Sequence, residues 1–295
     1  MGFRSGSLTA RRVMAIFLCV VGLTACATEQ TNSRLTTRPV AVPAALQEAD
    51  AALQDGRLEA AESRYLEVIG AEPGNAAALL GLGETYLGLG EWVKAGEAFA
   101  KITSGSPQAA AARQGEGIAL LQRSRDDEAL RLLEDAIKRD PRLWRAHNAL
   151  GLYYDKRGDR AKARQHFLDA LAINPRAAIV HNNLGYSLLL QRAYVEAAED
   201  FEKALALDQG LHVARNNLRF AWAWQGRYAE AVAGAPPTQM SQVLNDIGYI
   251  AMLRNDYDVA EAYFVRAMEA SPSYFDAAAR NLAQVRVLKG ISATR

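Results

Sequence analysis

The chain has 295 residues, of which 50% are hydrophobic and 23% are charged, a composition typical of globular proteins. Its formal net charge of +1 argues against a nucleic-acid binder, which needs clustered lysine and arginine to neutralise phosphates. The two cysteines, Cys19 and Cys26, both lie near the start, so the rest of the chain has no thiol for a disulfide, a zinc site or a nucleophile.

Residues 1–25 have the pattern of a lipoprotein signal peptide. Basic residues come first, and the apolar run from Val13 to Leu23 is too short to span a bilayer, which takes about 20 apolar residues. The run ends in Leu23-Thr24-Ala25-Cys26, which is similar to a bacterial lipobox, where the cysteine is lipidated and becomes the first mature residue. A plain secretory peptide with an incidental cysteine and a retained membrane anchor stay open as alternatives.

Residues 26–43 are expected to form a lipidated cysteine followed by a flexible tether, because they are polar, rich in threonine and closed by two prolines. Several acyl chains on Cys26 would hold the protein durably on a membrane. Ala27 favours the outer membrane, since an aspartate in its place favours inner-membrane retention in enteric bacteria. We therefore expect a cell-envelope protein that is lipid-anchored to the outer membrane and faces the periplasm.

From residue 42 onward the sequence repeats itself with a period of 34 residues. Small residues at positions 8 and 20, an aromatic residue or leucine at position 24 and a proline at position 32 match the tetratricopeptide pattern. Small side chains let two antiparallel helices approach, the aromatic ring fills the gap between pairs, and the proline ends the second helix. Repeats are expected to begin at Val42, Ala76, Ala110, Trp144, Ala178, His212 and Ser241.

The predicted fold is all-α: a right-handed tetratricopeptide superhelix, or α-solenoid, of about seven helix-turn-helix repeats with a C-terminal capping helix. The sixth repeat is expected to be degenerate, because Arg219 replaces the glycine at position 8 and Pro236-Pro237 cuts its second helix short. The solenoid spans residues 44–290, with repeats at about 42–75, 76–109, 110–143, 144–177, 178–211, 212–240 and 241–274 and a cap at 275–289.

No pattern in the sequence indicates catalysis. The histidines form no H-E-x-x-H motif, the glycines at residues 81–90 lack the strand and the Lys-Ser or Lys-Thr of a phosphate-binding loop, and no G-x-S-x-G occurs. His147 and His181 share position 4 of consecutive repeats, where we expect packing between helices, with metal binding between stacked repeats as the alternative. The sequence therefore predicts no enzyme activity, no cofactor, no metal site and no small-molecule substrate.

The first helix of each repeat is expected to line a groove for a protein partner. Position 5 is asparagine in the last four repeats, and position 9 is leucine or aromatic. Asparagine both donates and accepts hydrogen bonds, which suits the backbone of an extended peptide, and the aromatic rings supply apolar area. The alternative is that these side chains pack and hydrogen-bond within the stack. The candidate partner-binding residues are Asn148, Asn182, Tyr186, Asn216, Phe220, Asn245 and Tyr249.

Two stretches carry a narrower resemblance. They are NNLGYSLLLQRAYVEAAEDFEKALALD, from Asn182, and VLNDIGYIAMLRNDYDVAEAYFVRAMEASPSYFDAAARNL, from Val243. Together with the lipobox and tether, they make the chain resemble the TadD family of tetratricopeptide lipoproteins of Flp (tight adherence) pilus assembly. The resemblance implies an outer-membrane lipoprotein that assists pilus assembly, with the secretin or another secretion component as its partner. A pilotin of the type IV pilus class and an adaptor for another cell-envelope complex are the alternatives.

Overall fold

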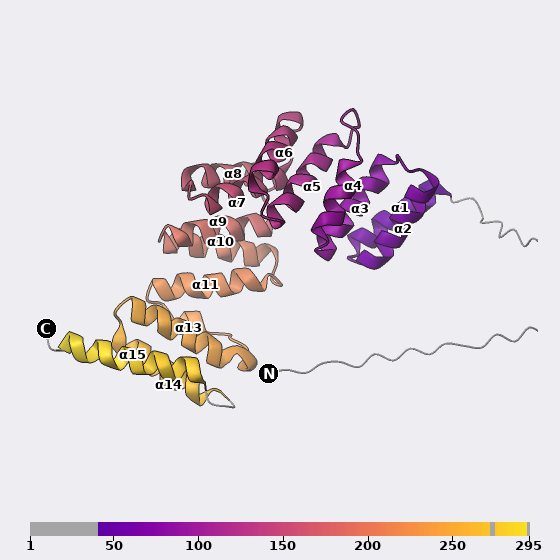
Figure 1. Cartoon of the computed structure of the whole chain (residues 1–295). Helices are drawn as coiled ribbons and strands as arrows, with labels where there is room; N and C mark the ends of the chain where they lie inside the picture. Colours follow the sequence, from indigo (N-terminus) through magenta and orange to yellow (C-terminus); the bar gives the residue numbers. More distant parts are fainter. Residues whose placement is uncertain (1–40, 272–274, 294–295) are drawn as a thin grey trace, which may run out of the picture. The chain divides into compact units, whose positions relative to one another are not determined.

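The computed structural model describes residues 41–271 and 275–293, and this part of the chain is helical throughout, without a strand (Figure 1). The predicted signal peptide, Cys26 and the tether up to residue 40 lie outside it. No helix in the described ranges is long and apolar enough to cross a membrane. The helices are α1 (Val42–Gln54), α2 (Leu58–Ala71), α3 (Ala76–Leu89), α4 (Trp92–Ala100), α5 (Ala109–Gln122), α6 (Asp126–Arg139), α7 (Trp144–Lys156), α8 (Arg160–Ile173), α9 (Ala178–Leu190), α10 (Tyr194–Leu207), α11 (His212–Trp224), α12 (Tyr228–Val232), α13 (Met240–Leu253), α14 (Tyr257–Glu269) and α15 (Asp276–Ala293).

Each odd-numbered helix up to α13 is the first helix of a repeat, here called helix A, and the even-numbered helix after it is helix B. Every helix A packs against its own helix B, and each one after α1 also packs against the preceding helix B, including α13 on the short α12. Each helix A before α13 packs in addition on the helix A of the next repeat. In the described residues no two B helices contact one another. The A helices therefore form one continuous face, and α15 extends it by packing on both α13 and α14. This arrangement confirms the predicted tetratricopeptide solenoid with a capping helix.

The turn between helix A and helix B has the same backbone geometry in all seven pairs. Position 15 of each repeat has a positive φ, which side chains with a Cβ adopt only at a cost. Glycine occupies this position in four pairs, whereas Ser124, Arg192 and Asn255 occupy it in the others, with φ between 58° and 66°. The fixed turn keeps helix B in one orientation against helix A, whatever residue the sequence places there.

The residue at position 24 fills the interior of each regular repeat. Phe201 and Phe264 are fully buried, and Phe99 is nearly so. The ring of Phe99 lies where a Cβ on Gly83 would be 2.4 Å from it, and where a Cβ on Gly115 of the next helix A would be 2.3 Å from it. Glycine at these positions is therefore required by the close approach of helix and ring, as the repeat pattern indicates.

Two predicted boundaries differ by more than one residue from the observed helices. α1 begins at Val42, so the last two residues assigned to the tether are helical, because Pro43 stands in the first turn, where its missing N–H costs nothing. α15 continues through Gly290 to Ala293, although the cap was expected to end before that glycine. A helix-interior glycine costs only about 1 kcal/mol, which does not stop a helix that is otherwise favourable.

Candidate functional site

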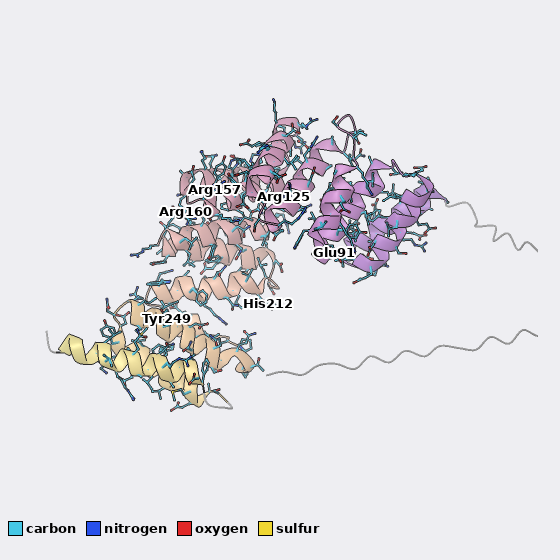
Figure 2. All side chains as sticks on the ribbon, viewed as in Figure 1. Glu91, Arg125, Arg157, Arg160, His212 and Tyr249 are labelled. Carbon is cyan, nitrogen blue, oxygen red and sulfur yellow. The ribbon has the colours of Figure 1, made fainter. Side chains whose placement is uncertain are left out.

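Large apolar side chains are exposed along the face that the A helices form. Seven of them, on α7, α9, α11 and α13, have between 41% and 50% of their surface exposed. Two are predicted partner-binding residues, Tyr186 and Tyr249, and Tyr249 is labelled on α13 in Figure 2. Exposed apolar side chains that gather on one face mark an interaction surface. The seven, here called the A-face row, are Leu152, Ile179, Tyr186, Leu190, Val213, Tyr249 and Leu253.

Three hollows lie along the same face. The first, of about 450 Å³, is bounded by α5, α7 and α9 and is lined by Asn148 and Leu152 among others. The second, of about 420 Å³, draws its walls from α9, α11, α13 and α15 and includes Phe220, Asn245 and Tyr249. The third, of about 250 Å³, lies between α11 and the start of α13 and is lined by Asn216 and Phe220. Five of the seven predicted residues thus line a hollow, whereas Asn182 and Tyr186 do not line these three.

Three of the four asparagines at position 5 are engaged within the stack. Asn183 donates to Asn148 at 2.9 Å, and Asn217 donates to Asn182 at 3.1 Å. Asn182 itself has only 5% of its surface exposed. The same contact recurs at the end of the solenoid, where Asn281 of the cap donates to Asn245 at 3.0 Å, and Asn245 is 7% exposed.

These hydrogen bonds between side-chain amides join one helix A to the next. Packing and hydrogen bonding within the stack was the alternative that the sequence left open for position 5. Of the predicted asparagines, Asn216 is the exposed one, and it lines the third hollow. Sequence reasoning missed the donors at position 6, Asn183 and Asn217. A pattern that could have indicated these donors was present in the sequence, because the Asn-Asn doublets at 182–183 and 216–217 recur at the 34-residue period.

The rim of the first hollow carries charges that are already paired. Arg145 donates to Glu84 of α3 at 2.8 Å, and Lys156 lies 2.7 Å from a carboxylate oxygen of Asp126. The other oxygen of Asp126 is buried without a hydrogen-bond partner in the described part of the chain. Because the rim charges neutralise one another, the hollow suits an uncharged or weakly charged group of a partner.

Arg219 explains how the sixth repeat closes without an aromatic residue at position 24. Helix α12 has five residues, and position 24 falls on Ala235, beyond its end. Arg219 is buried in the place of the usual glycine, and its guanidinium donates to the carbonyl oxygen of Ala233 at 3.3 Å. The arginine side chain thus links α11 to the segment that follows α12.

The guanidinium of Arg219 also gives the third hollow its charge. Its Nε has no hydrogen-bond partner among residues 41–271 and 275–293, and burial lowers the pKa of Arg219, as does the nearby Arg215. On the opposite wall, burial raises the pKa of Asp246, although hydrogen bonds from Gln242 and Asn245 oppose the rise. Burial thus shifts the pKa of each of these two groups toward its neutral form.

The histidines find partners within their own repeats. His147 of α7 faces His166 of α8, with 3.3 Å between their Nδ1 atoms. His181 of α9 pairs instead with Asp200 of α10, at 2.9 Å between Nδ1 and Oδ1. The prediction of packing between helices at position 4 fits these contacts, whereas the repeat pattern did not indicate that a second histidine would face His147. His166 follows His147 by 19 residues, and the two rings meet only because α7 and α8 pack antiparallel.

Comparison with protein families identifies this fold. A tetratricopeptide repeat model matches residues 46–110, 115–177 and 148–212, which together make up more than half of the chain, and a second tetratricopeptide model matches residues 241–274. The chain belongs to the tetratricopeptide repeat family. The tetratricopeptide fold is typical of scaffolds for protein–protein interaction.

Solved structures show the same fold. A chain of the APC/C hetero-tetramer Cut9–Hcn1 matches with a TM-score of 0.62 and 17% identity, over 81% of this chain and 48% of that one. A thermophilic tetratricopeptide protein of Thermus thermophilus, TTC0263, matches with a TM-score of 0.54 and 24% identity, over 65% and 98%. Pseudomonas aeruginosa pilF matches with a TM-score of 0.50 and 20% identity, over 83% and 96%. At these identities the likeness concerns the fold alone. No curated protein sequence matches the chain.

Proposed function

We propose that this protein is a non-catalytic, lipid-anchored scaffold of the outer membrane that assists assembly of an Flp (tight adherence) pilus. In this proposal the A-face row holds an extended segment of the secretin or of another secretion component. The row of exposed apolar side chains above the hollows carries the binding proposal. The lipobox that ends at Cys26 supports the anchor, and the stretch from Val243 to Leu282, with SPSYF before the cap, supports the pilus system.

The chemistry of the surface defines the segment that fits it. Tyr186, Tyr249 and the leucines beside them offer apolar area, and burying them against large apolar side chains would provide most of the binding free energy. The hollows between successive A helices are spaced along the solenoid, which suits an extended segment better than a single compact ligand. The exposed Asn216 offers a donor and an acceptor to the backbone of that segment. The buried Asn182 and Asn245 do not contact the segment in this proposal. Their hydrogen bonds hold neighbouring A helices, or the last helix A and the cap, in a fixed position relative to one another.

The double variant Tyr186→Ala/Tyr249→Ala is expected to lose at least about 30-fold in affinity for the partner, because hot-spot side chains contribute about 2 kcal/mol or more. The measurement introduces the variant into a strain that lacks this gene. Co-purification of secretin with the protein, secretin multimers and surface pili are then compared with the strain that carries the unchanged gene.

The matched control is Leu66→Ala/Val195→Ala, which removes two exposed apolar side chains from the B helices α2 and α10 and should leave co-purification unchanged. Equal loss in both double variants, with thermal unfolding intact, would contradict a binding site on the A face. Normal multimers and pili in the deletion strain would contradict the pilus role, and capture of a type IV pilus secretin would assign the pilotin alternative instead.

The variant Cys26→Ser is expected to remain unlipidated and to leave the outer-membrane fraction, because the serine hydroxyl cannot form the thioether that holds the acyl chains. Labelled palmitate should enter the unchanged protein and not the variant. Cys19→Ser, which lies inside the apolar run, is the control and should be labelled normally. An unchanged protein that takes no palmitate would refute the lipid anchor.

A further inference from the structure

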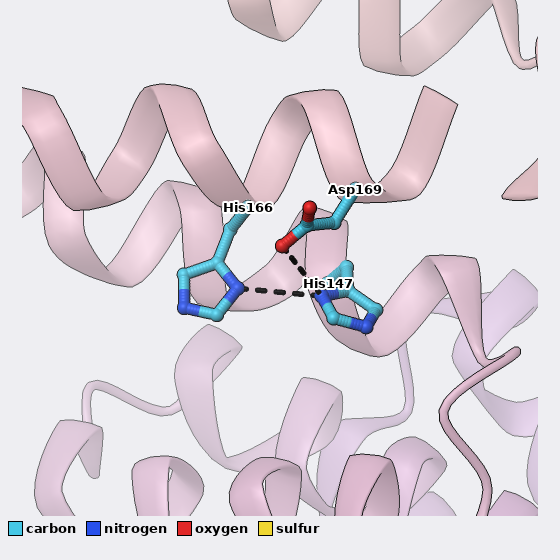
Figure 3. A group of neighbouring side chains, drawn as sticks. All are labelled: His147, His166 and Asp169. Carbon is cyan, nitrogen blue, oxygen red and sulfur yellow. Dashed lines mark hydrogen bonds and ion pairs between the residues drawn. The ribbon is translucent and has the colours of Figure 1, made fainter. Parts of the chain in front are cut away.

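Three side chains that commonly bind metals meet inside the fourth repeat (Figure 3). His147 lies on α7, and His166 and Asp169 lie on one face of α8, three residues apart. The Nδ1 atom of His147 is 3.3 Å from Nδ1 of His166 and 3.7 Å from Oδ2 of Asp169. One ligand atom from each residue lies within 4.8 Å of the others, and within residues 41–271 and 275–293 this is the one group of its kind.

The spacing of these atoms fits a tetrahedral ion. Zinc binds histidine nitrogen at about 2.0–2.1 Å, so two nitrogens on one tetrahedral zinc lie about 3.3 Å apart. We propose that His147, His166 and Asp169 bind a single divalent transition-metal ion, zinc by preference, with water as the fourth ligand. Two imidazoles and one carboxylate select zinc or its neighbours in the first transition row over magnesium and calcium, which prefer oxygen ligands only.

Neighbouring residues hold two of the three ligands in position. Gln165 donates to Oδ1 of Asp169 at 2.8 Å, which leaves Oδ2 facing His147. The ring of Tyr154 stacks on the imidazole of His166 with the two planes 3° apart, and so fixes the direction in which that imidazole points. Such outer contacts orient metal ligands and raise affinity, because the ligands lose less freedom when the ion binds.

The exposure of the group also suits an ion. The His147 side chain is 12% exposed and that of Asp169 is 38% exposed, so an ion can reach the group from solvent along the carboxylate side.

The other repeats provide an internal comparison, because the three residues occupy positions 4, 23 and 26. In the third repeat, positions 4 and 26 are Arg113 and Asp135, which form an ion pair at 3.6 Å. In the fifth repeat, position 4 is again histidine, His181, but positions 23 and 26 are Asp200 and Lys203, and the lysine ammonium lies 3.5 Å from the aspartate.

In the third and fifth repeats these positions are therefore also in contact, through an ion pair or a hydrogen bond between the chain's own side chains. The fourth repeat alone fills all three positions with metal ligands. In the fifth repeat the cation that balances the carboxylate is part of the protein, whereas in the fourth repeat the metal ion supplies the positive charge. A bound ion would tie α7 to α8 in the repeat whose Asn148 and Leu152 line the first hollow.

Cobalt and zinc binding to the purified full chain tests the proposal. The chain carries no polyhistidine tag, and both cysteines are changed to serine so that thiols do not take the metal. After treatment with a chelator, titration with Co²⁺ should produce the visible absorption of a tetrahedral site at one ion per chain, and Zn²⁺ should displace it. Bound Zn²⁺ should raise the temperature of unfolding.

Four variants separate ligation from folding. His166→Gln and Asp169→Asn should weaken binding by more than about 100-fold, and Gln165→Ala by about 10–100-fold, since it only orients a ligand. His181→Gln, at the same position of the next repeat, should bind as the parent chain does. The proposal is overturned if the parent chain gives no tetrahedral cobalt spectrum. It is also overturned if His166→Gln and Asp169→Asn, folded by circular dichroism, bind as tightly as His181→Gln.

Discussion

Replacing Phe201 with alanine is expected to lower the free energy of unfolding by about 3–5 kcal/mol, which is the cost of removing a fully buried phenyl ring. The loss combines the transfer free energy of the ring with the cavity that it leaves. Phe201 stands on α10, which packs on both α9 and α11, so the cavity would open the contact between the fifth and sixth repeats. Urea unfolding monitored by circular dichroism measures the change.

The effect of Phe201→Ala is also expected to be local. The helices of the fifth repeat pack on those of the fourth and sixth repeats, so the loss concerns the fifth repeat and its two interfaces. Amide hydrogen exchange should accelerate most in α9, α10 and α11 and least in α1–α4. Val195→Ala provides the control on the same helix, because Val195 is 57% exposed and its truncation should change stability by no more than about 0.5 kcal/mol. Uniform acceleration along the whole chain would refute the nearest-neighbour description.

Replacing Gly83 with alanine is expected to destabilise the protein by about 1–3 kcal/mol, although alanine is the better helix former. The added Cβ would lie 2.4 Å from the ring of Phe99, and a Cβ placed on Gly115 of α5 would lie 2.3 Å from the same ring. The backbones of α3 and α5 therefore both confine the ring. The temperature and denaturant midpoints of unfolding measure the loss.

The matched control is Gly96→Ala on the partner helix α4 of the same repeat. Gly96 is also in a helix interior, but a Cβ there would meet nothing within 4 Å. This variant should gain about 0.5–1 kcal/mol, which is the intrinsic preference of a helix for alanine over glycine. The difference between the two variants isolates the packing cost at Gly83. If both variants stabilise the protein, the close approach between α3 and Phe99 is not a constraint.

Much of the fold could be predicted from the sequence, because the residues that decide how the two helices of a repeat pack lie within that repeat. Glycine at position 8 and phenylalanine at position 24 are complementary in volume, and this complementarity recurs at a fixed period. The helix starts that the period indicates, such as Ala76, Trp144, Ala178 and His212, coincide with the observed helix starts. Even the departure in the sixth repeat was visible, as Arg219 in place of glycine and Pro236-Pro237 after a short helix.

The candidate surface was predicted less completely, because a helical period tells which residues share a face and not how deeply each is buried. Tyr186 and Tyr249 are exposed on the A face, as a binding role requires. Asn182 and Asn245 share that face, yet both are buried between successive A helices, where they accept hydrogen bonds from position 6 of the next repeat or from the cap. Their burial depends on the distance between A helices, which the side chains of neighbouring repeats set together.

The sequence by itself determined the solenoid, because the volumes at a few repeated positions leave one way to pack the helices. Only the tertiary structure decided which polar groups meet. His147 and His166 are 19 residues apart in the chain, and Arg219 reaches the carbonyl of Ala233. These contacts arise where an antiparallel turn brings the two helices of one repeat together. The 34-residue period of the sequence predicts where each repeat begins. Which polar side chains meet inside a repeat depends on the distance between its two helices, which the period does not give.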